Sequence, residues 1–154
     1  MKNKLISPAL LGWATLGVLL LNLTSLRVAA ADMKLEAQLI WGTDDAKSPD
    51  PKHKPVEPDV QKKLKELPLK WTHYFEVSRQ RLDVPKAAAK KVALSEKCQI
   101  EVRNLNGSNV EVSLYGRGEH VWKRTQSLPK GEILVLGGNA PNCTAWLVTL
   151  KRSE

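Results

Sequence analysis

The feature that most limits what this chain can fold into is an alternation of apolar and polar residues. Between Met33 and Trp41 every second residue is apolar, and a similar pattern returns between Leu69 and Val77. Because successive side chains of a strand point to opposite faces, a period of two predicts half-buried β-strands. These two segments therefore predict a sheet with one face against a core.

Shorter apolar runs, separated by glycine, proline and asparagine, predict further strands. They are expected at 90–94, on both sides of an Asn-Gly pair at 106–107, and at 120–125, 132–136 and 144–151. The last segment is apolar on both faces, which is typical of a central strand. Pro58 opens a short helix, in which Val60, Leu64 and Leu67 form one apolar stripe. The expected fold is mainly β: an antiparallel β-sandwich or partly open barrel of about eight strands with one short helix.

The Asn-Gly pair predicts a β-hairpin. A three-residue loop ending at the glycine pairs Val102 with Val110 and keeps the apolar residues of both strands on one face. It also places that glycine where a positive φ is needed. The cost of this register is that Glu101 lies opposite Glu111, which is a mildly destabilising pair.

The first 31 residues have the three parts of a secretory signal peptide. Two lysines precede an apolar run at 9–21, and three alanines end the segment. We expect cleavage after Ala31, or one residue earlier after Ala30, and export to the periplasm or the extracellular space. The alternative is a retained membrane anchor, which Pro8 and the polar residues from Asn22 onward disfavour.

Cleavage leaves 32–154 as a single β-rich exported domain, which is a usual length for one core. Residues 43–58 hold four of the nine prolines and predict an irregular loop. The whole chain has a net charge of +8, and because three cations lie in the leader, the exported domain is moderately basic. A basic surface suits anionic polymers but does not establish such a partner.

Cys98 and Cys143 are the two cysteines of the exported domain. In an oxidising compartment an even number of cysteines favours a disulfide, and closing so long a loop stabilises the fold by about 4 kcal/mol in the chain-entropy model. Their wide spacing is not that of a redox pair or a zinc knuckle. The alternative is two buried thiols that never meet.

Two blocks of the exported domain have a distinctive sequence, at 67–77 (LPLKWTHYFEV) and at 128–148 (LPKGEILVLGGNAPNCTAWLV). Together with the leader they resemble a group of small exported bacterial proteins of unknown function. The resemblance covers most of the exported domain and implies a bacterial envelope setting. It implies no activity, and no site residue is taken from it.

The sequence contains no phosphate loop, dinucleotide fingerprint, nucleophile elbow or zinc-protease helix, so no catalytic residue, metal or cofactor is predicted. His53 lies among aspartates in the proline-rich loop, but the spacing matches no known metal loop, and a solvated loop is preferred. His73 is expected in the core. His120, next to Glu119, could act as half of an acid–base pair only if the backbone turns there.

Trp122 is the leading candidate for ligand binding. The tryptophans at 41 and 71 belong to predicted core faces, whereas Trp122 is followed by Lys123 and Arg124, with His120 nearby. An indole beside cations can stack on sugar rings or nucleic-acid bases. The basic runs at 62–65 and 90–91 are interpreted as solvated surface, since lysines on strand edges also discourage aggregation.

These observations favour a non-enzymatic envelope module that binds a protein, a glycan or an anionic surface, with no integral membrane partner implied. One alternative is a small exported hydrolase that uses a histidine with a carboxylate, which requires His73 or His120 near such a group in a cleft. The other is a binder of anionic polymers, glycan or nucleic acid, with steeply salt-dependent affinity.

Overall fold

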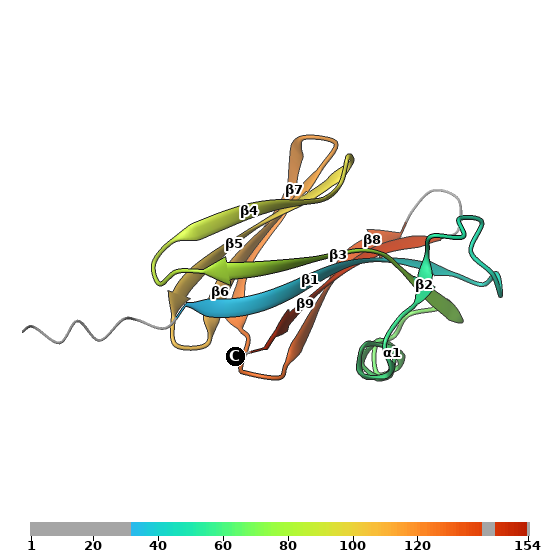
Figure 1. The fold of residues 1–154 in the computed structure, drawn as a ribbon, viewed down its shortest axis with the longest axis horizontal. Helices are drawn as coiled ribbons and strands as arrows, with labels where there is room; N and C mark the ends of the chain where they lie inside the picture. The colour runs from blue at the N-terminus through green and yellow to red at the C-terminus, as the bar shows by residue number, and fades with distance from the viewer. Residues whose placement is uncertain (1–31, 140–143, 154) are drawn as a thin grey trace, which may run out of the picture.

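A computed structural model describes residues 32–139 and 144–153, and these form two antiparallel sheets packed face to face (Figure 1). The five-stranded sheet has the order β2-β3-β1-β9-β8 and the four-stranded sheet the order β4-β5-β6-β7. The predicted β-sandwich is therefore confirmed, and the sheets do not close into a barrel. The predicted signal peptide lies outside the described residues.

The five-stranded sheet comprises β1 (Met33–Thr43), β2 (Lys54–Pro55), β3 (His73–Val84), β8 (Ile133–Asn139) and β9 (Ala145–Arg152). The four-stranded sheet comprises β4 (Ala89–Ser95), β5 (Cys98–Asn106), β6 (Asn109–Gly116) and β7 (Glu119–Ser127). The strand that was not predicted is β2, which has only two residues and lies inside the proline-rich segment. The rest of that segment is irregular, as predicted.

The main core lies between the two sheets. The alternation of β1 places Met33, Leu35, Ala37 and Leu39 on its inner face, where all four are buried. The inner faces of the other strands complete this core with Leu82, Val84, Leu94, Ile100, Val102, Val110, Val112, Leu134, Leu136, Val148 and Leu150. The predicted central strand is β9, which pairs with β1 on one side and β8 on the other.

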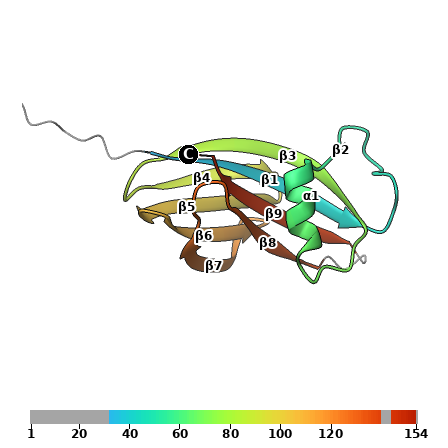
Figure 2. The ribbon, with the colours of Figure 1, turned by 90° about the horizontal axis from the view of Figure 1, so that it is seen from below.

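A second, smaller core lies on the outer face of the five-stranded sheet. The helix α1 (Pro58–Lys65) crosses this face, as Figure 2 shows, and buries Val60 and Leu64 against Ile40 and Leu147. Proline at the first helical position costs no hydrogen bond, which is why the chain can turn from loop to helix there. No helix of the described residues has the length and apolarity needed to cross a bilayer.

Ion pairs support the junction between this helix and the sheet. The guanidinium of Arg79 lies 3.0 Å from a carboxylate oxygen of Glu36, 2.7 Å from one of Glu57 and 2.6 Å from one of Glu76. These carboxylates raise the pKa of Arg79 above its already high ordinary value. Lys151 of β9 donates to Asp59 of α1. Because this cluster joins two strands to the segment at the helix start, we interpret it as structural.

The strands of the two sheets approach each other closely along one side, whereas on the opposite side only the connection at 128–132 links β7 to β8. β3 continues into β4 through a short turn, and Ser78 Oγ of β3 donates to the carbonyl oxygen of Leu94 in β4. Asn104 is buried beside the turn, and its Nδ2 donates to the carbonyl of Val84 at 3.2 Å. The opposite side lies between β7 and β8, and we call it the open side.

The predicted strand at 69–77 begins later than expected. Its residues 69–72 precede the first pair of the ladder, Thr43 with His73, and a bulge follows between Leu39 and Ile40 of β1. His73 is consequently half-exposed rather than in the core. Tyr74 takes a buried place beside α1 instead.

The hairpin between β5 and β6 has a different turn from the one predicted. Asn106 pairs with Asn109, so the loop consists of Gly107 and Ser108 only. Gly107 has a φ of +60°, whereas Ser108 does not have a positive φ, which is the pattern of a type II′ turn. The residue left over, Leu105, forms a bulge that keeps the apolar residues of both strands on one face.

This turn changes the partners along the hairpin. Val102 pairs with Val112, two residues away from the predicted partner. Arg103 now lies opposite Glu111, with 3.6 Å between its Nε and a carboxylate oxygen. The predicted contact between Glu101 and Glu111 is therefore wrong, and the observed register replaces a repulsive pair with an attractive one.

Gly137 in β8 allows a close approach to β9 that no other residue would permit. Its φ is +152°, and a Cβ there would collide with the carbonyl oxygen of Trp146 and lie 2.9 Å from Cα of Leu147. The next residue, Gly138, is different, because a Cβ there would meet nothing within 4 Å.

We predict that Gly137→Ala lowers the free energy of unfolding by about 3 kcal/mol, because the backbone must shift to admit the methyl group. Gly138→Ala is the matched control and should change it by less than about 0.5 kcal/mol. Urea unfolding of the two variants measures both values. Equal values for the two would contradict the close approach of β8 to β9.

Candidate binding cleft

The five-stranded sheet extends beyond the four-stranded sheet at one end, so part of its inner face has no strand opposite it (Figure 1). Trp41 of β1 is the register partner of Phe75 on one side and of Trp146 on the other, and Gly138 follows on β8. Register partners share one face of a sheet. We call Phe75, Trp41 and Trp146 the aromatic row.

The proline-rich segment covers Trp41 and Phe75 but not Trp146. His53 lies against Trp41, with 6.2 Å between the ring centroids, and Phe75 lies 6.1 Å from Trp41 on the other side. Both Trp41 and Phe75 are consequently buried. Trp146 receives no such cover, and 47% of it is exposed.

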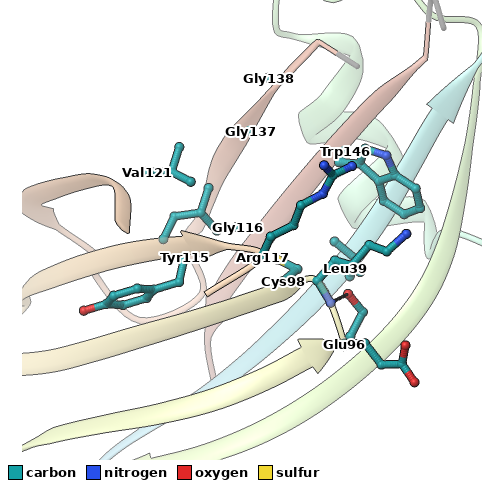
Figure 3. A pocket seen from close by; sticks show the side chains of 13 residues that line it. Leu39, Glu96, Cys98, Tyr115, Gly116, Arg117, Val121, Gly137, Gly138 and Trp146 are labelled. Atoms are coloured by element: carbon teal, nitrogen blue, oxygen red, sulfur yellow. Dashed lines mark hydrogen bonds between the residues drawn. The ribbon is translucent and has the colours of Figure 1, made fainter. Parts of the chain in front are cut away.

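A cleft of about 820 Å³ opens at this end of the sandwich, between the inner face of the longer sheet and the strand ends of the shorter one (Figure 3). Its walls are mostly apolar, and its volume lies in the range of small-ligand sites. The longer sheet contributes Leu39, Gly137, Gly138 and Trp146. The shorter sheet contributes 95–98, 114–117 and Val121.

Two large apolar side chains of the described residues are exposed, Val121 and Trp146, and both line this cleft. They come from different sheets, β7 and β9, so their proximity is a product of the tertiary fold. Gly138 adds to the space beside Trp146, since it has no side chain and a Cβ there would point into open volume. The cleft is therefore an exposed apolar surface of the kind that marks binding sites.

Arg117 supplies a positive charge to this apolar site. It lies in the turn between β6 and β7, and in Figure 3 its side chain extends across the cleft in the direction of Trp146. Its φ is +52° and that of Gly118 is +85°, so the two form a type I′ turn. Asparagine or glycine is favoured at both central positions of that turn, and arginine there is strained.

The predicted candidates Trp122, Lys123, Arg124 and His120 all lie on β7, beside the cleft rather than in it. Trp122 is half-buried and packs against the main core, so it is not the exposed indole that we expected. His120 meets the edge of the Tyr115 ring, with 5.4 Å between centroids. Lys123 Nζ lies 3.0 Å from a carboxylate oxygen of Glu111.

A smaller hollow of about 380 Å³ does contain three of those residues. Trp122, Lys123 and Arg124 line it from β7, and 135–137 line it from β8. Of the residues that line the cleft, Val121 lies on the same strand as the predicted candidates, whereas Trp146 and Arg117 lie elsewhere, and sequence reasoning singled out none of the three. The unusual arginine before Gly118 was the one sequence signal that could have indicated Arg117.

His73 and His120, the two histidines considered for acid–base chemistry, form no such pair in the described part of the chain. Nδ1 of His73 lies 2.9 Å from Thr72 Oγ1, and neither His73 nor His120 contacts a described carboxylate. His53 has Ser48 Oγ at 2.7 Å from Nδ1 and Asp50 at 3.7 Å from Nε2. No cluster of three or more histidine, cysteine, aspartate or glutamate side chains that could hold a metal ion occurs within residues 32–139 and 144–153.

The Ser48–His53–Asp50 arrangement organises the proline-rich loop. Ser48 Oγ also accepts from the backbone N–H of Asp50, and the N–H of His53 donates to the Asp50 carbonyl. All three residues lie in one local turn, and the imidazole packs on Trp41. These contacts explain why the loop stays against the aromatic row.

Cys98 is half-buried at the start of β5 and lines the cleft. Burial raises the pKa of its thiol. Cys143 lies outside the described residues, so the disulfide between Cys98 and Cys143 stays a prediction. Cys98 forms no disulfide with any described residue.

The two basic runs do not form one surface. Lys62, Lys63 and Lys65 lie on α1, over the outer face of the five-stranded sheet, whereas Lys90 and Lys91 lie on β4 in the other sheet. Lys91 Nζ sits 3.8 Å from the centroid of the Tyr115 ring.

Comparison with known proteins adds no relative, since no family model, curated protein or solved structure matches this sequence.

We predict that Arg117→Asn raises the free energy of unfolding by about 0.5–1 kcal/mol, because asparagine accepts a positive φ more readily than arginine. Arg124→Asn is the control, because it also replaces an arginine with asparagine, but at a position of β7 where φ is not positive. Urea unfolding at matched salt measures both. An Arg117→Asn variant less stable than the control would show that the turn does not strain this residue.

Proposed function

We propose that this protein is a non-enzymatic binding module of an exported compartment and that the cleft is its binding site. The single observation that carries the proposal is the convergence of Val121 and Trp146, the two exposed large apolar side chains of the described residues, on one cleft. Fully burying a large aliphatic side chain gains roughly 1.5–3 kcal/mol, and a ligand that covers these two half-exposed side chains would gain part of such an amount from each.

The strained Arg117 supports the same proposal. Backbone strain persists where the residue has a use, and here it brings a guanidinium to the rim of an apolar site. Lys97 lies on the same rim. A ligand that combines an apolar part with a negative charge suits this arrangement.

The two alternatives receive less support. A histidine–carboxylate hydrolase requires a histidine in the cleft, and none of the three histidines lines it. A binder of long anionic polymers requires a continuous basic surface, and the two lysine runs lie on different sheets.

The anionic apolar dye anilinonaphthalene sulfonate tests the cleft. We expect one molecule to bind per folded chain, and Trp146→Ala to weaken binding about tenfold, because the indole is the largest exposed apolar surface there. Dye fluorescence titration measures the affinity, and circular dichroism confirms that the variants fold.

Val121→Glu and Thr125→Glu form a matched pair for this titration. Each adds one negative charge to β7, but Thr125 does not line the cleft. Val121→Glu should weaken dye binding about tenfold more than Thr125→Glu. Equal effects of the two variants, or dye binding that Trp146→Ala leaves unchanged, would refute the cleft as the site.

Export has its own test. In a bacterial host that makes the whole chain, we expect the protein in the periplasm, beginning at Asp32 or one residue earlier. Cys98 and Cys143 should resist alkylation until a reductant is added. The alkylation is done in denaturant, because the raised pKa of Cys98 would slow the reaction in the folded protein. A cytosolic protein that begins at Met1 would contradict export, and thiols that react without reductant would contradict the disulfide.

A further inference from the structure

We propose that β8 binds an extended segment of another exported protein as an additional strand of the five-stranded sheet. The segment would have apolar side chains at alternate positions and an acidic residue at the end beside the cleft. This inference rests on the proposed function and names the class of ligand, which is an unfolded or looped stretch of polypeptide rather than a small molecule.

The two sheets of the described structure have four edge strands, β2 and β8 in one sheet and β4 and β7 in the other. An exposed edge pairs readily with other chains unless lysine, proline or an inward-pointing charge prevents it. β2 consists of Lys54 and Pro55, β4 carries Lys90 and Lys91, and β7 carries Lys123 and Arg124. β8, with the sequence ILVLGGN, has neither a charged residue nor a proline. Three edges are thus protected and one is not.

One side of the β8 backbone has hydrogen-bonding groups that pair with no described residue. Arg152 N donates to the carbonyl of Glu132, so hydrogen-bonded pairs with β9 recur at every second residue from there. Ile133, Val135 and Gly137 then direct their N–H and C=O groups away from β9. No backbone group of 133–138 makes a hydrogen bond to a described residue outside the β8–β9 ladder.

Hollows lie along β8 from 132 to 138. One of about 380 Å³ lies beside 132–135 and is lined also by Lys63 and Leu67 of the helical segment. The hollow lined by Trp122, which has about the same volume, follows at 135–137, and the cleft with Trp146 follows at 137–138. Side chains of an added strand would alternate between the two sides of the sheet. The hollows are therefore where its apolar residues would be buried.

The charges around this edge select the partner. Lys97, Arg117 and Arg124 line the cleft or the smaller hollow and form no ion pair with a described residue. Glu96 and Glu132 are the carboxylates that line the three hollows. Because the three cations without an ion pair all lie beside 135–138, an acidic residue at the end of the bound segment next to the cleft fits better than a basic one.

Synthetic peptides test this proposal directly. The probe is a fluorescein-labelled nine-residue peptide, Glu-Val-Thr-Val-Thr-Val-Thr-Val-Glu, which spans roughly the length of β8 with one residue to spare at each end. A second peptide replaces both glutamates with lysine. A third is the first peptide with methylated backbone nitrogens at alternate positions, which keeps the side chains but removes donors needed for strand pairing.

We expect the first peptide to bind, and fluorescence anisotropy measures its affinity. The lysine peptide should bind at least about fivefold more weakly than the first, and the methylated peptide about tenfold more weakly. Arg124→Glu should reverse the preference between the glutamate and lysine peptides. Lys54→Glu is the matched control, because it makes the same change on β2, at the opposite edge of the sheet, and should leave the preference as it was.

The site of binding has a separate readout. Amide hydrogen exchange should slow at Ile133, Val135 and Gly137 when the glutamate peptide is present, with no change in β7. Protection in β7 instead, or a methylated peptide that binds as well as the parent, would overturn strand addition at β8. So would a concentration-dependent dimer formed through β8, detected by sedimentation, because the occupant would then be a second copy.

The two proposals can fail separately. If the dye occupies the cleft and none of the peptides binds, the cleft remains the binding site and the strand-addition inference is wrong. If the glutamate peptide pairs with β8 while the dye does not bind, the cleft proposal is wrong, since the edge alone then accounts for recognition.

Discussion

The two sheets share one apolar core but are sealed along one side only, and the rest of the structure depends on this asymmetry. On the sealed side β3 runs directly into β4, and the bond from Ser78 to the Leu94 carbonyl holds the two edges together. On the open side β7 and β8 are both edge strands, and the chain between them buries Leu128 in the core. Two of the hollows lie at this open side, and the cleft at the end of the sandwich reaches it through Val121, Gly137 and Gly138.

The sheets also differ in length, and this difference exposes a further part of the core face. The longer sheet continues past the shorter one, so its inner face must find other cover there. His53 and the proline-rich loop cover Trp41, but the cover does not reach Trp146. The aromatic row is thus buried at Trp41 on β1 and exposed at Trp146 on the neighbouring strand β9. The cleft lies beside the exposed Trp146.

Much of the fold could be predicted because local patterns were strong. Alternation identified β1 and its core face, Pro58 and the stripe of Val60 and Leu64 identified α1, and the two apolar faces of 144–151 identified β9 as central. Each of these signals depends on neighbours in sequence, and burial follows from them with little help from the rest of the fold.

The site could not be predicted in the same way. Trp146 belongs to a central strand, and alternation alone assigns it to the core. Its exposure depends on where the other sheet ends, which no local pattern records. The hairpin register failed for a related reason, because the bulge at Leu105 was needed to combine a two-residue turn with a continuous apolar face. Trp122, chosen for its basic neighbours, is half-buried against the main core.

The central claim is that β8 is an open edge in the free protein, and backbone hydrogen exchange measured residue by residue tests it most directly. The account predicts an alternation along β8: amides of Leu134 and Leu136, bonded to β9, should exchange at least about tenfold more slowly than those of Val135 and Gly137. Uniformly slow exchange along β8 in a monomer would show that the edge is already covered, and it would contradict the account.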